Sequence, residues 1–167
     1  IQNRMGIGDM VIFLPFVEAI STSLNTPVSL LVKENTKCLE YLSDNPKIDN
    51  IITLDRNDKK KTGKHYGVKG IFNLAKEIKK YNFDKVFIFN SSLRYNLISR
   101  LAGIKEIFQY PLFEKQNQHI TKPAKAIIKK YLNIETIDNP EIQIDNNLVQ
   151  KSAVKFDIKN DELNVLL

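Results

Sequence analysis

The chain has 167 residues, 43% of them hydrophobic, which is enough to bury one core of ordinary domain size. Its 25 Lys and Arg residues outnumber its 19 Asp and Glu residues, and the net charge of +6 favours an anionic partner such as a phosphorylated substrate, a nucleic acid or a membrane surface. The single cysteine, Cys38, excludes an internal disulfide and is typical of a reducing compartment, so we expect a cytoplasmic protein.

The opening stretch, IQNRMGIGDMVIFLPF, has the pattern of a short strand, a tight glycine turn and an apolar helix. Gly6 and Gly8 directly precede Asp9, which stands where the helix should begin. From Met10 to Leu24 apolar residues cover most faces, as expected of a helix buried against a sheet. Neither this run nor any other approaches the roughly 20 residues that a membrane-spanning helix needs.

Short apolar strands alternate with amphipathic helices along the rest of the chain. Further strands are predicted at Val28–Val32, Ile51–Leu54, Val86–Phe89, Ile107–Tyr110 and Ile142–Ile144. Further helices are predicted at Asn35–Leu42, Ile71–Tyr81, Leu93–Ala102, Pro123–Leu132 and Leu148–Phe156. This alternation predicts an α/β fold with a Rossmann-like, doubly wound parallel sheet.

A polar and cationic stretch, DRNDKKKTGKHYGVKG at Asp55–Gly70, interrupts the short connections, and we expect it to form a long exposed loop. His65 within it is expected to be exposed rather than catalytic. In a doubly wound sheet, ligands bind beyond the carboxyl ends of the strands. Three segments should therefore meet there: the Gly6–Asp9 turn, this loop and the Asn90–Arg94 turn.

The Gly6-Ile7-Gly8 turn resembles a phosphate-binding turn only in part. The third glycine of the dinucleotide fingerprint is absent, because Val11 stands in its place, and the Gly-Lys-Ser/Thr of a P-loop does not follow. Asp9 puts a carboxylate where a phosphate would need bare N–H groups. Asp9 is therefore either a base that accepts a proton from a hydroxyl group, or only the cap of its helix.

Several short motifs resemble glycosyltransferase family 9, the heptosyltransferases of lipopolysaccharide core assembly. The pattern R-M-G-I-G-D-M-V-x-x-L-P at 4–15 resembles the first motif of that family. Agreement continues in chain order at Asp44–Asp49, Tyr81–Val86, Ser91–Arg94 and Leu101–Ile104. Each motif is only moderately specific, but together they cover nearly the whole chain.

The resemblance implies a two-domain GT-B glycosyltransferase. Residues 1–160 would form the N-terminal, acceptor-binding domain, and residues 161–167 would begin a truncated domain that binds the nucleotide-sugar. The family's first-motif Asp corresponds to Asp9, which would be the base for inverting transfer of a sugar, typically heptose from ADP-heptose, to a glycan or glycolipid hydroxyl. The nucleotide-sugar is then a co-substrate, and neither a cofactor nor a metal is expected.

An acceptor rich in phosphate and carboxylate would need positive and polar partners at the predicted site. Arg94 is the leading candidate, because a guanidinium can grip an oxyanion with two hydrogen bonds. The alternative is an Arg on the helix surface. The other candidates are Arg4, Gly6, Ile7, Gly8, Asn90, Ser91, Lys60 and Lys61. The lysines can equally be a solvated charge run or a contact with the inner face of the cytoplasmic membrane.

Two further functions stay open at this point. The chain can be a non-catalytic Rossmann-like module that binds a nucleotide or another anion, although the incomplete glycine pattern and Asp9 argue against it. RNA binding through the lysine-rich loop is less favoured, because no aromatic residues alternate with the basic run to stack on bases. We therefore expect no nucleic-acid partner.

Overall fold

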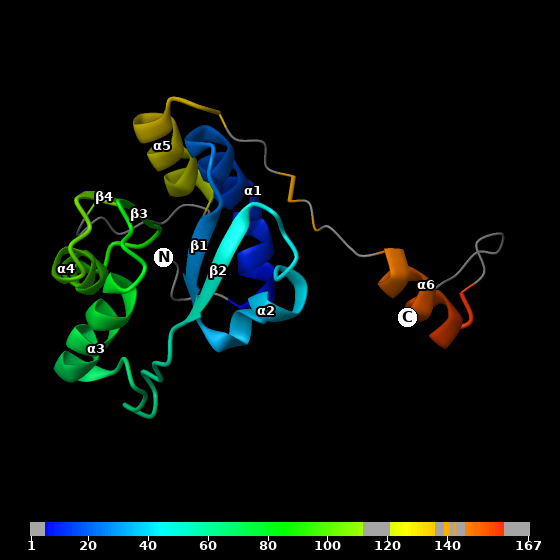
Figure 1. Cartoon of the computed structure of the whole chain (residues 1–167), viewed down its shortest axis with the longest axis horizontal. Helices are drawn as coiled ribbons and strands as arrows, with labels where there is room; N and C mark the ends of the chain where they lie inside the picture. Colours follow the sequence, from blue (N-terminus) through cyan, green and yellow to red (C-terminus); the bar gives the residue numbers. More distant parts are fainter. Residues whose placement is uncertain (1–5, 112–120, 136–138, 141, 143–145, 159–167) are drawn as a thin grey trace.

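The structure, a computed structural model, describes residues 6–111, 121–135, 139–140, 142 and 146–158 (Figure 1). Three sequence predictions lie outside these residues: the strand before Gly6, the site residue Arg4 and the start of a second domain at 161–167. The elements in order are α1 (Ile7–Leu24), β1 (Val28–Val32), η1 (Glu34–Thr36), α2 (Cys38–Tyr41), β2 (Ile48–Thr53), α3 (Gly67–Lys79), β3 (Lys85–Ile88), α4 (Leu93–Leu101), β4 (Glu106–Gln109), α5 (Thr121–Leu132) and α6 (Asn146–Lys155).

The predicted helices and strands are found within a few residues of their expected bounds, with two exceptions. The helix expected from Asn35 is divided into η1 and α2, because Lys37 between them takes a left-handed φ of 55°. The strand expected at Ile142–Ile144 is not seen at Ile142, which lies in no helix or strand; Ile144 is not among the described residues.

The four described strands form two parallel pairs. β1 pairs with β2, and β3 pairs with β4, so the described residues do not form one continuous hydrogen-bonded sheet. Parallel strands joined through helices are nevertheless the arrangement that the sequence predicted. The predicted α/β class is confirmed.

Two hydrophobic cores lie on opposite faces of the strands. Side chains alternate between faces along a strand, and in β1 Leu30 and Val32 join the core under α1 and α5 whereas Leu31 joins the core under α3 and α4. β3 divides in the same way, with Phe87 on the first face and Ile88 on the second. Figure 1 shows α1 on one side of β1 and β2, with α3 and α4 on the other. This is the doubly wound arrangement.

Helix α1 is apolar enough to qualify by composition as a membrane-spanning helix. It has 18 residues and a mean hydropathy of 1.5, and it is the one such helix among the described residues, so the expectation that no run is long enough was too strict. Its side chains, however, belong to the first core: Phe13, Leu14 and Phe16 are buried, and Phe13 meets the Phe89 ring edge-to-face at 5.3 Å between centroids. Packing against the strands accounts for its hydrophobicity.

A glycine fixes how closely α3 approaches the loop before it. A Cβ on Gly70 would lie 2.2 Å from the backbone carbonyl carbon of His65. Gly70→Ala would ordinarily stabilise a helix interior by about 0.5–1 kcal/mol. Here we expect the substitution to lower the free energy of unfolding by about 1–3 kcal/mol in urea denaturation, because backbone must move to make room.

Lys69→Ala is the matched control, since Lys69 is exposed on the same helix turn and should change stability by less than about 0.5 kcal/mol. A Gly70→Ala protein more stable than the wild type would contradict the close approach.

Candidate active site at the carboxyl ends of the strands

Contacts bring the three expected segments to the carboxyl ends of the parallel strands. The Phe13–Phe89 contact places the first turns of α1 beside the end of β3, directly before Asn90. Arg94 Nη2 in the first turn of α4 donates a hydrogen bond of 2.6 Å to the carbonyl of His65 in the Asp55–Gly70 loop. The convergence predicted from topology is therefore present between the loop and α4, and between α1 and the end of β3.

Asp9 occupies the first turn of α1 and is half-buried. Gly6, and not Asp9, is the N-cap residue, because α1 begins at Ile7. Asp9 is the third helical residue, and its Oδ2 accepts a hydrogen bond of 3.4 Å from the backbone N–H of Gly6, as the third residue of a capping box does. The bond is long for an N–H···O contact. No described atom lies within 4 Å of the position that a Cβ would take on Gly6 or on Gly8. Within the described residues, the turn beside Asp9 has open space on the side of both glycines.

The turn between β3 and α4 is held by side-chain amides. Asn90 Oδ1 accepts a hydrogen bond of 3.0 Å from the Ser92 N–H, so the Asn90 side chain orients the turn. Nε2 of Gln109, on β4, donates hydrogen bonds of 3.0 Å to the carbonyls of Asn90 and Ser92. Ser91 is exposed at the tip of this turn. The turn is thus a fixed platform from which α4 starts.

Two guanidinium groups lie close together at this edge. Arg94 is half-buried, and its Nε is buried without a hydrogen-bond partner among the described residues. Burial first, and then the positive charge of Arg56, lower the pKa of Arg94 from its ordinary value. Arg94 also stands at the N-terminus of α4, where a cation is unfavourable. A bound oxyanion would offset the repulsion between Arg94 and Arg56 and the unfavourable position of a cation at the helix N-terminus. It would also give the buried guanidinium a charged partner.

Asp58 supplies negative charge that partly balances the two guanidinium groups. Its Oδ1 is 2.7 Å from Arg56 Nε, and its Oδ2 is 3.7 Å from Lys33 Nζ at the end of β1. The Arg56 Nε–H nevertheless lacks hydrogen-bond geometry to Asp58, so the two are an ion pair by distance only. One carboxylate therefore serves two cations directly, and Arg94 adds a third positive charge near them.

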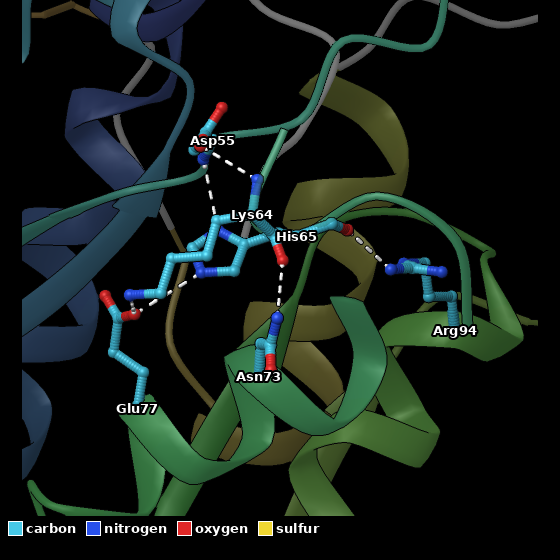
Figure 2. Close-up of polar contacts among 6 residues, drawn as sticks. All are labelled: Asp55, Lys64, His65, Asn73, Glu77 and Arg94. Carbon is cyan, nitrogen blue, oxygen red and sulfur yellow. Dashed lines mark hydrogen bonds and ion pairs between the residues drawn. The ribbon is translucent and has the colours of Figure 1, made fainter. Parts of the chain in front are cut away.

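The loop is ordered around a buried histidine. His65 is only 1% exposed, so the expectation that it would be exposed was wrong. Figure 2 shows the contacts: the Asp55 N–H donates to His65 Nδ1 at 3.1 Å, and His65 Nε2 lies 3.3 Å from Glu77 on α3. Since Nδ1 accepts, the proton of neutral His65 is on Nε2 and is donated to Glu77.

Further bonds tie the same loop down. Asp55 Oδ2 accepts from the Lys64 N–H at 2.8 Å, Asn73 donates to the Lys64 carbonyl at 2.9 Å, and Lys64 Nζ pairs with Glu77 (Figure 2). The expected long loop is thus anchored at its second half. Its tip, from Asn57 to Thr62, is exposed and carries Lys60 and Lys61.

Sequence reasoning missed Arg56, Asp58 and Lys33. Arg56 follows β2 by three residues and Lys33 directly follows β1, so a cation just past a strand end was the available signal. It was hidden by the more conspicuous lysine run. The burial of His65 had no local signal, because its partner Glu77 is twelve residues away.

Neither a cluster of metal ligands nor the largest groove is found at the candidate site among the described residues. No group of three or more His, Cys, Asp and Glu side chains converges within the described ranges. A groove of about 480 Å³ lies between β1 and β3, but its lining includes the residues that lead into these strands, Thr26–Pro27 and Tyr81–Asp84, and none of the candidate site residues. Ligands of doubly wound sheets bind at the opposite, carboxyl ends, so the chemistry is assigned there.

Comparisons with known proteins bear on this arrangement. No family model and no curated protein matches the chain. A glycosyl transferase family 9 protein from Veillonella parvula matches 95% of the chain with a TM-score of 0.67 at 16% identity. The ADP-heptose LPS heptosyltransferase II of E. coli matches 95% with a TM-score of 0.64 at 11% identity. The chain has the fold of half a family 9 glycosyltransferase.

The chain spans 49% and 50% of those two structures. The family resemblance seen in the sequence motifs and the likeness of the fold therefore agree, and the predicted Rossmann-like, GT-B-type fold is confirmed. At these identities the likeness concerns the fold. The roles of Asp9, the arginines and the lysines stay predictions.

The Glu77 cluster makes stability depend on pH. Burial opposes ionisation of Glu77, but the hydrogen bond and charge of Lys64, followed by the hydrogen bond of His65, lower its pKa below the ordinary 4.5. A lowered carboxyl pKa contributes stability at neutral pH that is lost as the pH falls through that lowered value. Glu77→Gln should therefore lower Tm near pH 7, and its difference from the wild type should shrink below pH 4.5, as followed by circular dichroism.

Glu40→Gln, which removes an exposed acid paired with Lys37 on α2, is the control and should leave Tm nearly unchanged. A Glu77→Gln protein with the wild-type pH profile would show that Glu77 does not anchor the loop.

Proposed function

We propose that the chain is the acceptor-binding half of an inverting glycosyltransferase. The observation that carries this is the pair of half-buried guanidinium groups, Arg56 and Arg94, at the carboxyl ends of the strands, where the first turns of α1, which carry Asp9, also lie. Positive charge at the carboxyl ends of the strands, together with a carboxylate in the first turn of α1, suits an acceptor that is both anionic and hydroxylated. The fold, shared with half of a family 9 glycosyltransferase, supports the same assignment.

In the proposed reaction Asp9 takes the proton of an acceptor hydroxyl. The freed oxygen attacks the anomeric carbon of the donor sugar while the bond from that carbon to the diphosphate breaks, so one displacement inverts the configuration. A carboxylate is a weak base, but the hydroxyl becomes acidic as its bond to an oxocarbenium-like carbon forms. The proton ends on Asp9 and the nucleoside diphosphate leaves with the electron pair.

The acceptor is proposed to be an anionic glycan or glycolipid. The guanidinium groups of Arg94 and Arg56 would bind phosphate or carboxylate oxygens, for which planar guanidinium groups are well suited. The open space beside Gly6 and Gly8 would admit the reacting hydroxyl next to Ile7 and Asp9. Asn90 and Ser91, with Lys60 and Lys61 on the loop tip, and Arg4 are proposed as outer contacts.

The donor is proposed to be a nucleotide-sugar, with ADP-heptose as the first candidate because that donor is named for the E. coli neighbour. In a GT-B enzyme the donor would bind a second domain, which fits the chain's span of about half of its structural neighbours. No metal or other cofactor is proposed. We place the protein in the cytoplasm, in peripheral contact with the inner membrane face.

A non-catalytic binding module is the second candidate. The observation that favours it is the hydrogen bond between Asp9 and the Gly6 N–H, since a carboxylate used as a helix cap need not act as a base. In the glycosyltransferase Asp9 would accept a proton during turnover, whereas in a binding module it would only stabilise the start of the helix. The effect of replacing Asp9 on kcat distinguishes the two functions.

In the full-length protein, Asp9→Asn should lower kcat by about 10²–10⁴-fold with little change in KM, because the amide keeps the size of the side chain but cannot take a proton. Glu18→Gln, an acid on the same helix paired with Lys47, is the control. Product formation with an ADP-heptose donor is the readout. Turnover near that of the wild type would remove Asp9 from the role of base and favour the binding module.

Arg56→Lys and Arg94→Lys should each raise KM for an anionic acceptor about tenfold or more with a smaller effect on kcat, because a point charge replaces a two-pronged donor. Arg100→Lys, exposed on the same helix as Arg94, should have no effect. An unchanged KM for a phosphorylated acceptor in both site variants would place the acceptor elsewhere.

A further inference from the structure

The outer side of α3 and α4 exposes large apolar side chains at regular spacing. Leu93, Leu97 and Leu101 recur every four residues on α4, and Val68 and Phe72 have the same spacing on α3. All five are between 42% and 72% exposed. Residues four apart lie on one face of a helix, so each helix carries an apolar stripe that the core does not cover.

Both stripes belong to one surface. The opposite faces of the two helices, through Leu74, Ile78 and Ile98, pack into the same hydrophobic core under the strands. The two helices also contact one another, and Figure 1 shows them as neighbours at one edge of the molecule. Their outward faces therefore form a continuous layer, called here the α3–α4 face.

Cationic side chains accompany these apolar residues. Lys69, Lys76 and Lys79 on α3 and Arg100 on α4 are exposed. The one acid in these two helices is Glu77, which is engaged by Lys64 and His65, and α4 contains no acid. The α3–α4 face therefore combines apolar side chains with uncompensated positive charge.

We propose that the α3–α4 face docks on an anionic lipid surface. Apolar side chains would enter the headgroup region while lysines, whose stems can lie along apolar surface, would contact lipid phosphates. A second copy of the chain fits poorly, because two identical cationic faces repel. The proposal rests on the membrane contact proposed above and assigns that contact to one face. It concerns binding only, so it can fail or succeed independently of catalysis.

The position of α4 connects this face with the candidate site. Leu93 and Arg94 are consecutive residues: Leu93 is exposed on the α3–α4 face, while Arg94 reaches inward to the His65 carbonyl. A lipid surface bound to the face would lie next to the guanidinium pair. An acceptor anchored in that surface could then reach the site without leaving the membrane plane.

The test is co-sedimentation of the full-length protein with phosphatidylcholine vesicles that contain about one third phosphatidylglycerol. We expect binding that weakens with salt and is absent for phosphatidylcholine alone. The double variant Leu97→Gln/Leu101→Gln should lose at least about tenfold in partition coefficient. Lys69→Gln/Lys76→Gln should lose a similar factor, since each lysine near an anionic surface contributes severalfold.

Matched controls change the same residue types on other elements. Leu39→Gln on α2, where Leu39 is 61% exposed, and Lys122→Gln/Lys130→Gln on α5 should bind as the wild type does. The proposal is overturned if the wild type does not bind the anionic vesicles, or if the controls lose as much as the face variants. It is also overturned if sedimentation reveals a dimer that Leu97→Gln/Leu101→Gln dissociates, which would make the face an interface between copies.

Discussion

Burial of alternate strand side chains into two separate cores is the constraint on which the described structure depends. Leu30 and Val32 of β1 require α1 on one face, and Leu31 requires α3 and α4 on the other. A sheet covered on both faces offers ligands only its edges and the ends of its strands. The two cores therefore decide where a site can form, before any polar residue is considered.

The polar residues then make one strand end specific. His65 is held between the Asp55 backbone and Glu77, and its carbonyl receives Arg94. This fixes a guanidinium group in a half-buried position near Arg56, where its charge is only partly balanced. Unbalanced charge at low exposure is costly unless a ligand or another group compensates it. Such a cost is common where a protein binds an oppositely charged substrate.

Helix α4 serves two surfaces at once. The buried side of α4 packs into the second core, and its outer side exposes three leucines. Its first turn places Arg94 at the carboxyl ends of the strands. Placing a charged site and an apolar stripe on one short helix keeps the two at a fixed separation. For a substrate with a polar head and a lipid anchor, that rigidity would align both parts together, which unites the proposed acceptor class with the proposed membrane contact.

Local sequence patterns determined most of the secondary structure of this protein. The apolar run of β1 predicted its bounds, and the spacing of Leu74, Ala75 and Ile78 predicted α3, because helix and strand periods depend on residues close in sequence. The motif at 4–15 indicated the family whose fold the chain shares. Tertiary structure alone decided that His65 is buried, that Arg94 meets the His65 carbonyl 29 residues away, and that Arg56 lies beside it. Those contacts depend on which side chains of a polar loop turn inward. Packing between segments that are distant in sequence determines this, and such packing produces no periodic pattern in the sequence.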